Sequence, residues 1–189
     1  MKQLHSLIKS SIEVPLKLAF LMLVITLIQY SFVIDLGFLG IKPLSIKNLI
    51  GIIFAPLIHG SMGHFMSNAV PFIVLSSFLY LFYRKDADRI LVFAYFIPSI
   101  IVWFSGRPYF HIGSSGIVYT LVFFIITAGI LKFRLKYFLI SLITLFFYGS
   151  LIYGVIPTER KISWEFHLSG AIVGIVTAFS VELKNKSKV

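Results

Sequence analysis

The sequence predicts an all-α, polytopic membrane protein with six transmembrane helices, and three observations predict that class. Its 189 residues are 58% hydrophobic, only 13% of them are charged, and the mean hydropathy is +0.96. A soluble domain is roughly half apolar and a quarter charged. The third observation is the order of the residues, because long apolar runs alternate with short charged loops along the chain. We expect a single membrane domain over residues 1–189.

The first apolar run, residues 14–34, is long enough to cross a bilayer and too long for the core of a signal peptide. No small-residue cleavage site follows it, so we interpret it as an uncleaved membrane helix. Residues 49–58 are apolar but too short to span, and we expect a re-entrant or interfacial segment there. The other expected spans are residues 63–83, 90–104, 115–131, 137–153 and 164–181.

Lys and Arg are unevenly divided between the two sides that six spans define. The side of the N-terminus carries 12 of the 17 cations, namely Lys2, Lys9, Lys17, Arg84, Lys85, Arg89, Lys132, Arg134, Lys136, Lys184, Lys186 and Lys188. The other side carries 5, namely Lys42, Lys47, Arg107, Arg160 and Lys161. Because cytoplasmic loops are enriched in Lys and Arg, we expect both termini in the cytoplasm. The net charge of +10 is then a topology signal, and we expect no nucleic-acid partner.

Four polar residues from three of the expected spans lie at a similar depth below the outer surface. His64 and Asn68 are four residues apart, so they share one face of the second span. Ser115 opens the fourth span from the same side, and His167 lies just inside the sixth. Taken singly, each is more simply explained by a hydrogen bond within or between helices. Together they predict a functional site, because polar groups inside a membrane are costly.

Glycines flank the serine pair that opens the fourth span. Gly113 and Gly116 enclose Ser114 and Ser115, and a glycine lets the backbone and a bound molecule approach a hydroxyl closely. The same composition is also an ordinary start of a helix, since serine is a favoured N-cap. The pair is therefore informative only together with the other three polar residues.

Two features predict that His167 approaches Ser115. Gly170 and Gly174 form a GxxxG pattern after the histidine, which most often lets two membrane helices pack closely. Tyr119 follows Ser115 by one turn on the same face, where it can pack against the imidazole.

These residue types together are suited to acyl transfer. A serine hydroxyl becomes a good nucleophile when a base such as histidine removes its proton. The negative charge of the tetrahedral intermediate needs donors, which His64, Asn68 and the backbone N–H of Ser115 can supply. Glu165 is two residues from His167 and should face away from it along a helix. We therefore expect a dyad of Ser115 and His167 without a third carboxylate, with the imidazole oriented by packing.

Other functions are less well supported by the sequence. A small transporter would favour broken helices in paired halves, which we do not find. A zinc site of His59, His64 and His167 lacks the Glu of an HExxH motif, and the chain has no cysteine. We expect no metal and no cofactor. We expect His59 to tie the preceding loop to the second span, and His111 to form a loop hydrogen bond.

The combined pattern resembles the rhomboid intramembrane serine proteases. The residues that carry the resemblance are His59, His64 and Asn68 in the second span, Gly113, Ser115, Gly116 and Tyr119 at the fourth, and His167, Gly170 and Gly174 in the sixth. Their order, their assignment to helices and the six-span length all agree. One departure is that residues 35–58 contain neither Trp nor Arg, whereas similar bacterial rhomboids often carry a Trp-Arg pair there.

The resemblance implies an activity and a site. Ser115 would be the nucleophile, His167 the general base, and His64, Asn68 and the Ser115 amide the oxyanion hole. The substrate would be a transmembrane helix of another protein, cut near its outer end in the lipid bilayer of a bacterial inner membrane. The fifth span and residues 154–163 would gate the substrate. The alternative within the family is an inactive relative that binds membrane-protein clients, although such relatives typically lack the serine or the histidine.

Overall fold

The structure, a computed structural model, describes residues 2–157 and 162–186. Five helical segments are long and apolar enough to cross a membrane: Ser6–Phe32, Met62–Phe82, Ala87–Ser105, Leu135–Val155 and Trp164–Lys184. Within the described residues no strand forms, and the one sheet-like pairing is an isolated bridge between Ile41 and His111. The prediction of an all-helical polytopic membrane protein is thus confirmed.

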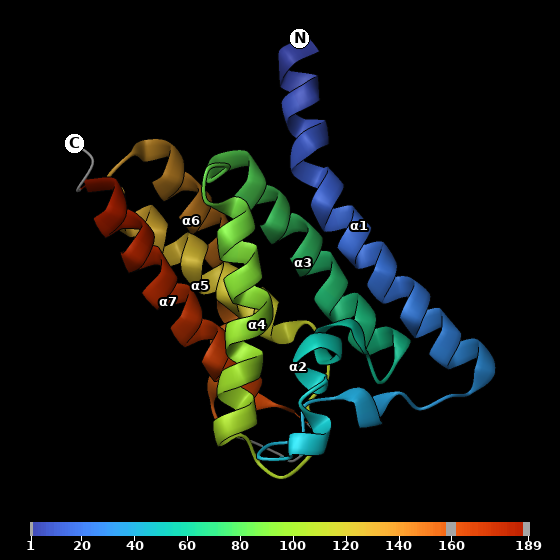
Figure 1. Cartoon of the computed structure of the whole chain (residues 1–189). Helices are drawn as coiled ribbons and strands as arrows, with labels where there is room; N and C mark the ends of the chain where they lie inside the picture. Colours follow the sequence, from blue (N-terminus) through green and yellow to red (C-terminus); the bar gives the residue numbers. More distant parts are fainter. Residues whose placement is uncertain (1, 158–161, 187–189) are drawn as a thin grey trace.

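The elements follow one another as a bundle with one irregular outer segment (Figure 1). In chain order they are α1 (Lys2–Phe32), η1 (Gly37–Leu39), η2 (Ile46–Asn48), α2 (Gly51–Phe54), η3 (Ala55–Leu57), α3 (Met62–Phe82), α4 (Ala87–Ser105), α5 (Ser115–Leu131), α6 (Leu135–Tyr148), η4 (Gly149–Val155) and α7 (Trp164–Lys186), where η denotes a 3₁₀ helix. The expected interfacial segment at 49–58 therefore consists of the short helices α2 and η3.

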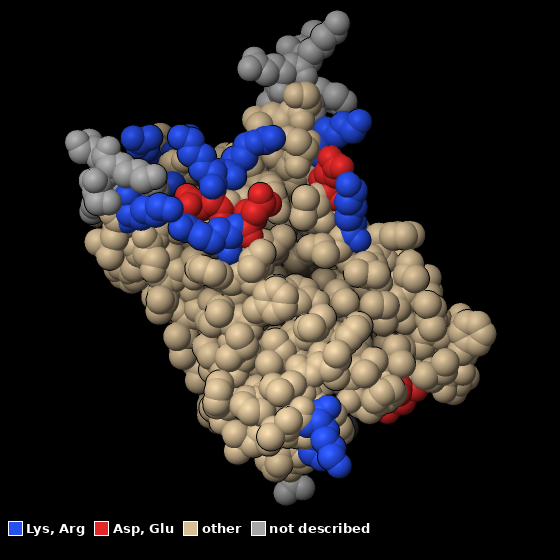
Figure 2. All heavy atoms as spheres, in the orientation of Figure 1, with Lys and Arg blue, Asp and Glu red and all other residues tan. Residues whose placement is uncertain are grey.

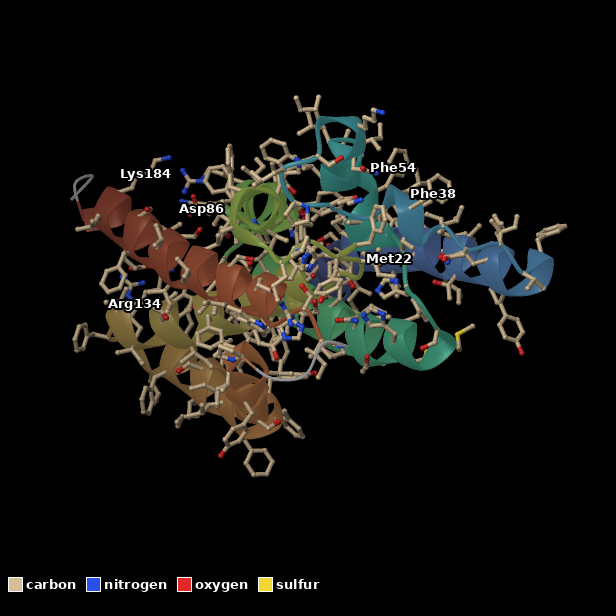
Figure 3. All side chains as sticks on the ribbon, turned by 90° about the horizontal axis from the view of Figure 1, so that it is seen from below. Met22, Phe38, Phe54, Asp86, Arg134 and Lys184 are labelled. Atoms are coloured by element: carbon tan, nitrogen blue, oxygen red, sulfur yellow. The ribbon has the colours of Figure 1, made fainter. Side chains whose placement is uncertain are left out.

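Helix α1 begins at Lys2, well before the apolar run expected from residue 14. The polar residues ahead of that run continue the helix, so the helix is longer than its membrane-crossing part. α1 packs against α3, and its Met22 is fully buried (Figure 3). The start of α1 and the end of α7 lie at the same end of the molecule (Figure 1).

Helix α5 forms the centre of the bundle. It packs against α3, α4, α6 and α7, and all its residues from Ser115 to Val122 are buried. At 17 residues it is about 26 Å long, shorter than the roughly 30 Å hydrocarbon core of a bilayer. It is short because the chain after α4 turns back into the bundle before α5 begins (Figure 1). Ser115 consequently lies inside the bundle rather than at its edge.

Helices α5 and α7 approach each other more closely than any side chain would permit. A Cβ atom at Gly170 would overlap the carbonyl oxygen of Gly116, and a Cβ at Gly174 would overlap that of Thr120. The GxxxG pattern therefore serves close helix packing, as its spacing predicts.

Charged side chains gather at the ends of the molecule. On the face drawn in Figure 2, Lys and Arg are concentrated at the end that holds the start of α1 and the end of α7. A wide band without charged side chains separates that end from a smaller charged group at the opposite end (Figure 2). Such a band is what a bilayer requires of the surface that faces its hydrocarbon core.

Candidate active site

Ser115 is the first residue of α5 and lines a cavity of about 790 Å³. Its neighbour Ser114 is fully buried, with its backbone nitrogen and its hydroxyl oxygen each 3.3 Å from Nε2 of His59. Gly113 precedes the pair with φ +107°, a conformation that residues with a side chain rarely adopt. At this turn Ser114 is hydrogen-bonded to His59, while Ser115 lines the cavity.

The cavity lies where α3, α5 and α7 begin. In the view from below, side-chain nitrogen and oxygen atoms gather in the middle of the bundle (Figure 3). Its polar lining residues are Ser61, His64, Ser67, Asn68, Arg107, Tyr109, His111, Ser115, Tyr119, Ser163 and His167. The structure thus brings together the four polar residues that the sequence placed at one depth, in a hollow large enough for a short stretch of peptide.

His167 is held in one orientation by two contacts. Its ring stacks on that of Tyr119, with centroids 4.2 Å apart and planes 5° apart. Its Nδ1 lies 2.9 Å from the carbonyl oxygen of Gly154. A carbonyl can only accept, so Nδ1 carries the proton and donates it, and Nε2 keeps a free lone pair. In this tautomer the imidazole can act as a base at Nε2.

His64 and Asn68 place N–H donors beside the turn before Ser115. A Cβ atom at Gly113 would lie 2.7 Å from Nε2 of His64 and 3.8 Å from Nδ2 of Asn68. The backbone N–H of Gly60 donates to Nδ1 of His64 at 3.4 Å, which leaves the imidazole proton on Nε2. The amide of Asn68 is itself fixed, since it donates to the carbonyl of His64 at 3.0 Å. Both side chains therefore present donors where only a glycine fits.

His59 and His111 have roles in the loops rather than at the cavity centre. His59 bonds to Ser114, and its ring packs edge-on against His64 and Phe65, so it joins the start of α3 to the start of α5. Burial, with a smaller contribution from His64, lowers the pKa of His59 to about 3. His111 forms loop hydrogen bonds, as expected, to Ser163 at 2.6 Å and to a backbone carbonyl at 3.0 Å. Burial also lowers the pKa of His111, which favours the neutral form of its imidazole.

Two features of the site were missed by sequence reasoning. The carbonyl of Gly154 orients His167, and a backbone carbonyl has no signature in the sequence. Arg107 binds Glu165 at the start of α7. The sequence did contain a signal for this pair, because Arg107 follows the third expected span and Glu165 begins the sixth on the same side of the membrane. The carboxylate of Glu165 bonds to Arg107, while the imidazole of His167 bonds to the carbonyl of Gly154.

The arrangement has the parts that acyl transfer needs. A hydroxyl, an oriented imidazole with a free Nε2, and several neutral N–H donors line one cavity. The residues that the structure describes contain no group of three His, Cys, Asp or Glu side chains that could hold a metal ion.

Comparisons with known proteins identify the family. The family model described as Rhomboid domain matches residues 47–183. An uncharacterized protein of Mycobacterium tuberculosis is 32% identical over 149 residues, which are 74% of this chain and 62% of the relative. An uncharacterized protein of Mycobacterium leprae is 30% identical over 149 residues, 74% of this chain and 59% of that relative. The chain thus spans about three fifths of the length of the curated relatives it matches. The domain match covers the segment that contains the cavity residues and is consistent with the all-helical membrane fold, and this chain belongs to the rhomboid family.

Proposed function

We propose that this chain is an intramembrane serine endopeptidase that uses a dyad of Ser115 and His167. The observation that carries the proposal is the state of His167. Its Nδ1–H is bound to Gly154 and its ring is stacked on Tyr119, so Nε2 is available in the cavity that Ser115 lines. Membership in the rhomboid family supports the same activity.

The first chemical step is attack on the scissile carbonyl. Nε2 of His167 accepts the hydroxyl proton of Ser115 while Oγ bonds to the carbonyl carbon. The carbonyl oxygen then carries a negative charge, which the Ser115 amide, Nε2–H of His64 and the Asn68 side-chain amide stabilise. Preorganised donors of this kind are effective because they are fixed before the charge develops.

The second step expels the amine and regenerates the enzyme. The imidazolium of His167 returns its proton to the leaving nitrogen, and the C–N bond breaks. A water molecule then attacks the ester of Ser115, again with His167 as base, and releases the acid product. Without a third carboxylate, the ring stack and the Gly154 carbonyl hold the imidazole through both steps.

The position of the cavity supports a membrane-embedded substrate. Ser115 begins the short central helix of an apolar bundle, so a segment that reaches it comes from within or beside the bilayer. We infer a transmembrane segment of another protein, locally unwound so that its peptide bond fits the cavity. The weakly buried α6, together with residues 154–163, is the proposed gate. Residues 158–161 of that segment lie outside the part of the chain that the structure describes.

We also propose the topology that the charge distribution favours. If α5 is counted as a crossing beside the five long apolar segments, the single domain has six crossings. An even number agrees with the start of α1 and the end of α7 lying at one end (Figure 1). Lys and Arg gather at that end on the face drawn in Figure 2. We therefore place both ends in the cytoplasm, in a bacterial inner membrane.

The test is covalent labelling of the purified, detergent-solubilised protein with a fluorophosphonate, which reacts with activated serines. Wild type should label, and Ser115→Ala and His167→Ala should not. Ser114→Ala is the matched control, because that neighbouring hydroxyl is committed to His59 and should not be needed for labelling. An unlabelled but folded wild type would instead support a relative that binds membrane-protein clients without cutting them.

A further inference from the structure

A cluster of hydrogen bonds joins the loop before Ser115 to the start of α7. We call it the Arg107 latch; its members are Arg107 and His111 on the loop and Ile162, Ser163 and Glu165 at the helix. Arg107 Nε binds Oε1 of Glu165, Nη2 lies 3.1 Å from Oε2, and the backbone N–H lies 3.2 Å from Oε1. Both carboxylate oxygens are thus engaged, in the two-pronged geometry that only a guanidinium provides.

The latch has further bonds on each side of the ion pair. Arg107 Nη2 also donates to the carbonyl of Ile162 at 2.9 Å. His111 bridges the same two segments, with Nδ1 2.6 Å from the hydroxyl of Ser163 and Nε2 3.0 Å from the carbonyl of Arg107. The rings of Tyr109 and Trp164 lie beside the guanidinium, at 5.9 and 5.7 Å.

The carboxylate of Glu165 is almost buried, with 6% of its side chain exposed, while the side chain of Arg107 is 29% exposed. A carboxylate at this depth is stable only when its charge is paired and its oxygens are hydrogen-bonded. The pair therefore fixes the position of the loop relative to α7, whereas a surface ion pair contributes little to structure or stability.

The latch joins the two segments that carry the proposed dyad. Arg107 belongs to the loop that leads into Ser115, and Glu165 lies two residues before His167 on α7. Successive helical residues point in different directions, so Glu165 grips the loop while His167 faces Tyr119. Arg107, Ile162 and Ser163 also line the cavity, so the same bonds shape its wall.

We propose that Arg107 and Glu165 are positioning residues that hold the first turn of α7, and with it His167, in register with Ser115. This inference rests on the proposed function. The latch acts where the dyad lacks a carboxylate of its own: it leaves the imidazole untouched and fixes the helix that carries it. A displacement of about 1 Å at such a site can lower a rate by roughly 100-fold.

The test uses conservative variants, because Arg107→Ala would leave the buried carboxylate of Glu165 unpaired and could prevent folding. Arg107→Lys keeps the charge and loses the fork, and Glu165→Gln keeps the shape and loses the charge. Each should lower the rate of fluorophosphonate labelling of folded protein by about 10- to 100-fold. With a transmembrane peptide substrate, kcat should fall by a similar factor while KM changes by less than about 2-fold. The double variant should be no slower than the slower single variant, because both changes break one contact.

Lys42→Met is the matched control, since this cation is at the same end and lies 5.4 Å from the ring of Phe110, outside the latch. It should label at the wild-type rate. If the folded fraction of Arg107→Lys and of Glu165→Gln labels at the wild-type rate, with or without a loss of thermal stability, the pair only stabilises the fold and the inference is wrong. Failure of the proposed function looks different, because wild type itself would then not label.

Discussion

The imidazole of His167 lies flat on the ring of Tyr119, 4.2 Å away and within 5° of parallel. Serine hydrolases commonly use an aspartate to orient the catalytic imidazole. In this site a stacked ring and a backbone carbonyl perform that task. The stack fixes the plane of the imidazole, and the carbonyl of Gly154 fixes its rotation within that plane.

The stack leads to a prediction about Tyr119. Tyr119→Phe keeps a flat ring and should label with a fluorophosphonate at a rate close to that of wild type. Tyr119→Leu removes the flat surface and should slow labelling by about 10- to 100-fold, because the imidazole gains freedom to rotate. Equal rates for the Phe and Leu variants would show that the stack does not matter.

Gly154 should tolerate no side chain. A Cβ atom there would overlap the hydroxyl of Tyr119 and lie 3.0 Å from Nδ1 of His167. Gly154→Ala should therefore displace the imidazole and abolish most labelling. Gly149→Ala, in the same η4 segment, meets only the side chain of Leu145 at 3.2 Å and should label normally. Normal labelling of both variants would show that the contact between Gly154 and His167 is not needed for the reaction.

Asn68 is expected to stabilise the oxyanion. Asn68→Ala should lower kcat by about 100- to 1,000-fold with a transmembrane peptide substrate. Ser67→Ala is the control: its hydroxyl donates to the same carbonyl of His64 at 2.9 Å but is not assigned to the oxyanion. An unchanged kcat in Asn68→Ala and in His64→Ala would place the oxyanion hole elsewhere.

The burial of His59 predicts a pH dependence of stability. Its pKa of about 3 in the folded chain lies below the usual 6.5, so the unfolded chain binds more protons between those values. The contribution of this neutral histidine is complete above pH 6.5 and is lost as the pH falls toward 3. The loss approaches about 1.4 kcal/mol per pH unit. Thermal unfolding in detergent at pH 7.5 and pH 5 should show a smaller drop for His59→Gln than for wild type.

A second ion pair should stabilise the end of the molecule at which α1 begins and α7 ends. Nζ of Lys132 lies 3.5 Å from Glu182 and over the rings of Tyr83 and Tyr137, at 4.6 and 4.2 Å. Lys132→Met leaves a buried carboxylate unpaired and should cost about 3 kcal/mol of unfolding free energy. Adding Glu182→Leu should recover most of that loss. Thermal denaturation is the measurement, and Lys136→Met, an exposed cation near one of the same rings, should change little.

The membrane fold could be predicted because it depends on composition and order. A continuous apolar run predicts a membrane helix, since the bilayer leaves few other structures possible. The helix ends were less predictable. α1 begins at Lys2 because polar residues can either continue a helix beyond the membrane or form a loop, and the apolar run does not distinguish the two.

That the four central polar residues line one cavity could be predicted, because their positions along the expected helices place their side chains at a similar depth. The contacts that orient them could not. Gly154 acts through its carbonyl, which every residue has, and Arg107 meets Glu165 only because loop and helix converge in three dimensions. His59 was expected to tie the preceding loop to the second span, and its bond to Ser114 at the start of α5 had no signal in the sequence, because it arises where the chain after α4 turns back into the bundle.

The close contact of α5 and α7 has a consequence for comparing sequences. At Gly116, Gly170 and Gly174 a single methyl group would meet an opposing side chain or backbone atom at 2.5 Å or less. A homologue that keeps its serine and histidine but has a larger residue at one of these positions would hold the two helices apart. In a saturation-mutagenesis screen, these three positions should therefore be as intolerant of substitution as Ser115 itself, although none of them has a reactive group.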